Sequence, residues 1–330
     1  MKQSVILFAA ALAFAACSQD SEDRSQDSNI IQLSAAISGG DGVKAGTRAD
    51  GTSSFVAQLQ NTQFETGKQV YVEVYDHSTG NTYTESTKSF TVAADQGSIA
   101  GSRLLNGTIY YPATGSSVDI CAYYPHTVNS STNQFPSSGT IADQTTIANY
   151  QNFDLMYATK LTEKTKGERH SLTFNHAMAQ IIVNIVPDDD SKVTASDITA
   201  KVSSVKIKNT VPIAQLTITD GVITAAAKTG EAAAAIDILG SNDGNTKATS
   251  VGIIVPQTVT AGEFIDITYA GTTHHYSLES SKNFDGGYKY VYTFKMKAAG
   301  IELESLKITN WSVDTNADGQ GNSGSGDFTI

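Results

Sequence analysis

The chain of 330 residues has few of the side chains on which catalysis and nucleic-acid binding most often depend. It contains two cysteines, one tryptophan and six histidines, and only 17% of its residues are charged. The formal net charge of −11, with no cluster of lysine or arginine, argues against a nucleic-acid partner. It has no phosphate-binding glycine loop, zinc-protease motif or nucleophile elbow. The sequence therefore predicts a protein that is not an enzyme.

Long hydrophobic runs are also scarce, and the clearest one is at the N-terminus. Residues 5–14 are apolar but too few to cross a bilayer as a helix, and Lys2 precedes them. Two alanines lead into Cys17, and acidic residues follow it. This pattern resembles a bacterial lipoprotein signal over residues 1–16, after which Cys17 would carry lipid such as palmitate and anchor the chain in the outer membrane. The alternative is an ordinary secretory signal that ends at a cysteine.

If Cys17 carries lipid, Cys121 has no partner for an intrachain disulfide. Cys121 lies in the apolar stretch VDICAYYP and is predicted to be a small buried hydrophobic residue. Hydrophobic residues make up 40% of the chain, enough for real cores, and serine, threonine, glycine, tyrosine and valine are abundant. Such a composition is typical of a β-rich extracellular protein.

Alternating apolar and polar residues predict strands along most of the chain. Residues 69–75 place three valines on one face, and a turn-forming HSTGN sequence follows them. Residues 179–186 are nearly all apolar, which favours a central buried strand. Pro187 and three aspartates come next, and we expect a domain boundary there. The predicted fold class is all-β, with two tandem β-sandwiches.

We therefore expect four parts in the chain. They are the signal peptide (1–16), a tether with the first strand and a loop (17–54), an N-terminal β-sandwich (55–187) and a C-terminal β-sandwich with a glycine-rich tail (188–330).

The histidines suggest no catalytic or metal site. His274 and His275 are adjacent, so on a strand they point to opposite faces and cannot both ligate one ion comfortably. His176 is flanked by apolar residues, which favours a hydrogen-bonded structural histidine over a catalytic one.

One segment has the spacing of a calcium loop. Asp314, Asn316 and Asp318 stand at alternate positions and a glycine follows, as at the start of an EF-hand loop. The twelfth position is Ser325 and not glutamate, so the segment is not an EF-hand. A flexible linker with no ion is the alternative.

Several segments, in order, resemble the fimbrillin family, whose members are subunits, anchors and tips of the type V pili of Bacteroidota. The segments are the lipobox at Cys17, KAGTRAD around Arg48, IYYPATGSSVDICAYYP, FDLMYA, LTFNHAMAQIIVNI and KITNW before a glycine-rich tail. The resemblance covers most of the chain. It implies two transthyretin-like β-sandwich domains, a place on the cell surface in a fimbrium, and a role in cell adhesion.

The resemblance also implies assembly by strand donation between fimbrillin subunits. An Arg-specific surface protease would cut between Arg48 and Ala49. The departing strand would carry Ile30, Ile31, Leu33 and Ile37, and a strand from a neighbouring subunit would fill the groove it leaves. The alternative is that Arg48 is only a solvated loop residue.

Two further questions stay open in the sequence. Only four residues, 327–330, follow the polar C-terminal loop, which is short for a donated strand and favours a tip or accessory subunit over a stalk subunit. The competing function is a glycan-binding lipoprotein of a nutrient-uptake system. It would stack sugars on tyrosines such as Tyr110, Tyr111, Tyr123 and Tyr124.

Overall fold

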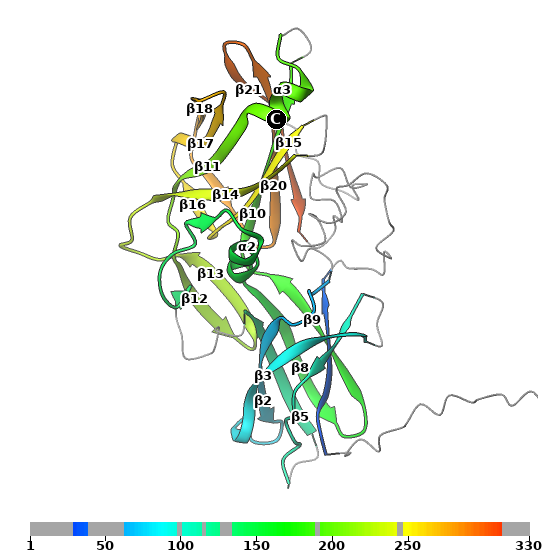
Figure 1. Cartoon of the computed structure of the whole chain (residues 1–330). Coiled ribbons are helices and arrows are strands. Elements are labelled where there is room, and N and C mark those ends of the chain that lie inside the picture. Colours follow the sequence, from blue (N-terminus) through cyan, green and yellow to red (C-terminus); the bar gives the residue numbers. More distant parts are fainter. Residues whose placement is uncertain are drawn as a thin grey trace, which may run out of the picture.

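The computed structural model describes residues 29–38, 63–97, 101–113, 117–125, 134–188, 192–242 and 247–311. Within them the chain is nearly all β-structure, which confirms the predicted fold class (Figure 1). The elements in chain order are β1 (Gln32–Ile37), β2 (Gln69–Asp76), β3 (Thr82–Gln96), β4 (Arg103–Asn106), β5 (Ser117–Tyr124), β6 (Gln134–Phe135), β7 (Asp143–Gln144), α2 (Ile147–Phe153), β8 (Met156–Thr165), β9 (Arg169–His176), β10 (Ala179–Pro187), α3 (Ala195–Lys201), β11 (Val202–Thr210), β12 (Ala214–Thr219), β13 (Val222–Ala227), β14 (Ala234–Asn242), β15 (Ala248–Ile254), β16 (Gln257–Val259), β17 (Gly262–Tyr269), β18 (Thr272–Leu278), β19 (Lys282–Phe284), β20 (Tyr288–Lys297) and β21 (Gly300–Asn310).

The first sheet closes on itself as a barrel in the order β1-β4-β3-β2-β5-β8-β9. Its strands show the predicted alternation: Val70, Val72 and Val74 on β2 are fully buried inside the barrel. The HSTGN turn forms as expected between β2 and β3. Its first residue follows Asp76, whose carboxylate accepts hydrogen bonds from the backbone and side chains of Ser78 and Thr79.

The second sheet has the order β18-β17-β11-β14-β15-β10-β20-β21, with β7 added beside β14. β10 pairs antiparallel with β15 and parallel with β20, and nearly all of it is buried, as its apolar sequence predicts. The two helices that the structure describes, α2 and α3, are short and capped by threonine side chains. Thr146 caps α2, and Thr194 forms a capping box with Asp197 at the start of α3.

The chain changes sheets earlier than the sequence indicated. β9 ends in the first sheet at His176, and β10 starts in the second at Ala179. The boundary expected after Pro187 is therefore too late, because β10 is a central strand of the second sheet. Some residues that precede β8 in the chain also pack with the second sheet. Phe135, Ile141 and Tyr150 belong to the same hydrophobic core as the buried residues of that sheet.

A small sheet of β13, β12 and β6 joins the two parts. In Figure 1 the β12–β13 hairpin lies beside the barrel, and its apolar residues share one core with Cys121 and Tyr123 of β5. The approach is close at the hairpin turn, where a Cβ on Gly221 would lie 2.8 Å from the sulfur of Cys121. Only glycine fits this position, which also has a positive φ of 79°.

Candidate functional site

The first strand closes the barrel and is paired on both of its edges. β1 runs antiparallel to β4, with Leu33 opposite Leu105, and parallel to β9, with Ile37 opposite Phe174. Beyond the strand, the Ile31 N–H donates to the Ile109 carbonyl at 2.8 Å. Without β1, both β4 and β9 would present an unpaired edge.

The side chains of β1 alternate between the barrel core and its outer side. Ile31, just before the strand, and Leu33, Ala35 and Ile37 within it are almost fully buried in the same core as Phe64 and Phe174. Three of the four residues expected on a departing strand thus face the core. Ile30, the fourth of these residues, is only half-buried. Ala35, which was not among the expected residues, also faces the core.

The burial of side chains on and next to β1 holds this strand in the barrel. Fully burying an isoleucine or leucine side chain is worth about 1.5–3 kcal/mol, so three of them contribute roughly 5–9 kcal/mol before entropy is counted. One feature weakens this hold: the Ser34 hydroxyl is buried and has no hydrogen-bond partner among the described residues.

The other predicted site residues lie outside the described residues. These are the lipidation site Cys17, the processing pair Arg48 and Ala49, and the calcium-loop residues Asp314, Asn316 and Asp318. Arg48 falls between β1 and Gln63 in the sequence, so the proposed cut would separate β1 from the rest of the barrel.

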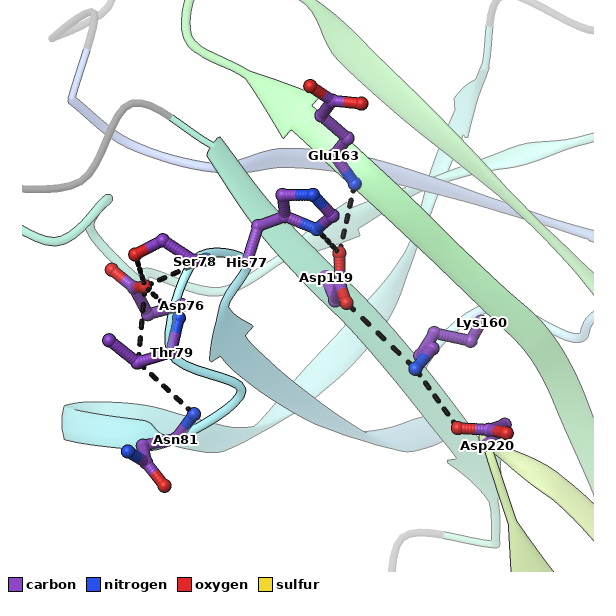
Figure 2. Close-up of polar contacts among 9 residues, drawn as sticks. All are labelled: Asp76, His77, Ser78, Thr79, Asn81, Asp119, Lys160, Glu163 and Asp220. Carbon is purple, nitrogen blue, oxygen red and sulfur yellow. Dashed lines mark hydrogen bonds and ion pairs between the residues drawn. The ribbon is translucent and has the colours of Figure 1, made fainter.

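A chain of charges links the barrel to the β12–β13 turn. Figure 2 shows Lys160 of β8 between Asp119 of β5 and Asp220 of the turn, and Asp119 also accepts from His77. The Lys160 Nζ lies 3.1 Å from Asp220 Oδ1 and 3.9 Å from Asp119 Oδ2. Burial alone would raise the pKa of Asp119, but the Glu163 backbone N–H, His77 and Lys160 together hold it below its usual value.

A second link between the two parts is formed by a stacked ring pair. The His176 ring, at the end of β9, stacks on Trp311, just after β21, with centroids 3.9 Å apart and planes 2° from parallel. His176 Nδ1 lies 2.7 Å from Oδ1 of the buried Asp154. The predicted hydrogen bond of His176 is confirmed. Burial raises the pKa of the Asp154 carboxyl.

The sequence missed both links, because their members are far apart along the chain and carry no local signal. It did predict the state of Cys121, which is buried, with a pKa that burial raises to about 12.

The tyrosines proposed for sugar stacking are not arranged for it. Tyr111, Tyr123 and Tyr124 are buried, and Tyr110 alone among these four is exposed, at 45%. A single exposed ring is not a stacking platform. The structure therefore gives no support to the glycan-binding alternative at these residues.

Comparisons with known proteins agree with the barrel-and-sheet architecture. A family model for fimbrillin-like proteins matches residues 47–311. The chain belongs to the fimbrillin-like family. Among the relatives of this fimbrillin-like protein is Fim1C, a candidate fimbrium subunit of Bacteroides uniformis. The two are 27% identical, over 94% of this chain and 96% of Fim1C.

Crystal structures of two candidate cell adhesion proteins share the fold of this fimbrillin-like protein. The one from Bacteroides uniformis has a TM-score of 0.61 at 22% identity and covers 86% of this chain and 98% of its own. The one from Bacteroides ovatus has a TM-score of 0.60 at 16% identity, with coverages of 86% and 97%. The family is one of fimbrial structural proteins and not of enzymes. No helix in the described ranges has the length and apolarity to cross a membrane.

Proposed function

We propose that this chain is a fimbrial subunit that mediates cell adhesion and is assembled by exchange of its first strand. The observation that carries the proposal is the position of β1, which fills the seam between β4 and β9. Leu33 and Ile37 of this strand and Ile31 just before it are buried. The family match supports it, because it begins at residue 47, after β1 and next to Arg48.

The route to the surface would start from a lipoprotein. Cys17 would carry lipid and hold the chain at the outer membrane until an Arg-specific surface protease cuts between Arg48 and Ala49. The cut releases β1 from the covalent chain, and the seam then offers two unpaired strand edges and a row of apolar pockets. A strand from another fimbrillin subunit has the matching chemistry: backbone hydrogen bonds supply affinity, and alternate apolar side chains fill the pockets.

Within the fimbrium, a tip or accessory position fits the described C-terminal strand best. β21 pairs with β20 from Gly300 to Asn310, and Trp311 after it is buried. Donating β21 to a neighbour would expose Trp311 and break its stack on His176. Gold labelling of isolated fimbriae tests this position: label at fibre ends supports it, and label repeated along the shaft contradicts it.

The assembly proposal is tested by blocking the cut. Cells that produce the Arg48→Ala variant should retain the uncut chain and lose heat-sensitive oligomers that contain it. Arg24→Ala is the matched control, because Arg24 is the other arginine ahead of β2 and lies before β1. This variant should be processed and assembled normally. Normal oligomers from the Arg48→Ala variant would overturn the proposal.

A further inference from the structure

Neighbouring strands at one edge of the second sheet bring three metal-binding side chains together. Glu263 and Asp266 of β17 and His275 of β18 each offer one ligand atom, and these atoms all lie within 4.8 Å of one another. Asp266 is directly opposite His275 in the antiparallel pair, and its Oδ1 lies 2.7 Å from the His275 Nδ1. Imidazole nitrogen and carboxylate oxygen are both donors that zinc accepts in proteins.

A β-bulge explains how Glu263 comes to be part of this group. On a regular strand, residues three apart point to opposite faces, so Glu263 and Asp266 would be separated. The pairing of β17 with β18 shifts register between Glu263 and Ile265, and Phe264 and Ile265 are both fully buried as a result. The extra residue returns Glu263 to the side of Asp266. Bulges re-aim side chains in this way at many functional sites.

We propose that Glu263, Asp266 and His275 form a binding site for a divalent transition-metal ion such as Zn²⁺. Ligand atoms about 2.0–2.2 Å from a tetrahedral zinc ion lie about 3.3–3.6 Å from one another. The ligand atoms here lie within 4.8 Å of one another, so the widest pair has to close by about 1 Å. Glu263 can make this movement, because its side chain is 55% exposed. Three protein ligands leave coordination positions open for water or for a group from another molecule. The imidazole favours zinc, copper or nickel over calcium or magnesium.

Lys208 of β11 forms ion pairs with both carboxylates of this group. Its Nζ lies 3.3 Å from Asp266 Oδ2 and 3.6 Å from Glu263 Oε2. The Lys208 ammonium donates a hydrogen bond to Asp266, and as a cation it competes with a metal ion for both carboxylates. Its side chain is partly exposed and can turn to solvent when the ion binds.

Two histidines on the same chain are matched controls. His274 is adjacent to His275 but on the other face of β18, and it is not part of the group. His77 also pairs with a carboxylate, Asp119, at 2.8 Å, but in the part of the chain that the structure describes it belongs to no three-ligand group. A site that depends on three ligands should lose metal binding when His275 is replaced. It should keep metal binding when either control histidine is replaced.

Titration calorimetry with Zn²⁺ on the untagged purified chain tests the proposal. We expect one ion per chain, loss of this binding in His275→Ala and in Asp266→Asn, and unchanged binding in His274→Ala and His77→Ala. Removing the competing ammonium with Lys208→Ala should tighten binding by about tenfold. Unchanged melting curves without zinc would show that the variants fold.

Absence of zinc binding by the wild-type chain would overturn the proposal, and so would equal losses in His275→Ala and His274→Ala. Weaker binding in Lys208→Ala would also contradict it. The site is independent of strand exchange, so failure of one proposal leaves the other standing.

Discussion

Replacing Leu33 with alanine should destabilise the barrel only while β1 is part of it. Leu33 is 2% exposed and lies between Leu105 of β4 and His170 of β9. Truncating a buried leucine to alanine costs about 2–5 kcal/mol. A loss of about 3 kcal/mol in a folding unit of this size lowers the melting temperature by about 6–12 °C. Scanning calorimetry on the uncut chain should show this decrease in the transition of the barrel.

The cut form makes the test specific. In the proposed assembly, the chain is cut after Arg48 and a strand from another subunit replaces β1. Leu33 is then absent from the barrel, so the variant and the wild type should have the same melting temperature. Ala36→Ser is the control in the uncut chain. Ala36 is only half-buried on the outer side of β1, so this change should cost less than about 0.5 kcal/mol. A decrease of less than about 1 °C in the uncut Leu33→Ala chain would refute the assigned role of β1, as would an equal decrease in the cut form.

Three further predictions concern the links between barrel and sheet. Gly221→Val should push the β12–β13 turn away from Cys121, because overpacking at this close contact costs about 1–3 kcal/mol. Thiol labelling of Cys121 in the native state should then be about tenfold faster. Unchanged labelling would mean that the turn is not tightly docked. Trp311→Ala should cost about 3–5 kcal/mol in urea unfolding, since the ring is buried against His176, and a loss below about 1 kcal/mol would show that the stack is unimportant. The lowered pKa of Asp119 contributes stability above the unfolded value of about 3.9 that is lost as pH falls. Asp119→Asn should therefore be less stable than wild type at pH 7, and this difference should shrink as pH falls through the lowered pKa of Asp119. A difference that does not shrink in acid would exclude this charge effect.

Local periodicity was enough to predict the strands and much of their burial. The alternation of Val70, Val72 and Val74 gave the inward face of β2, and the apolar run of residues 179–186 gave a central strand. Both signals are carried by neighbours in the chain. The burial of the outer face of β2 was not predictable in the same way. Tyr71 and Tyr75 on this face pack against a core whose other residues include many that lie more than a hundred positions later in the chain.

The domain boundary shows where local composition misleads. Pro187 and the aspartates after it mark the end of β10, and the sequence does not reveal which sheet that strand joins. Sheet membership depends on pairing with β15 and β20, far along the chain.

The grouping of Glu263 with His275 likewise depends on a bulge that no residue pattern announces. The pairing of Lys160 with Asp220 depends on the docking of a distant hairpin.

In the proposed assembly, β1 leaves the barrel. The N-terminal sequence of the protein recovered from fimbriae on the cell surface, read together with its apparent mass in unboiled samples, tests it most directly. If β1 leaves the barrel, the recovered chain should start at Ala49 and run as a ladder of heat-sensitive oligomers. A lipidated start at Cys17 and a single monomer band would contradict it.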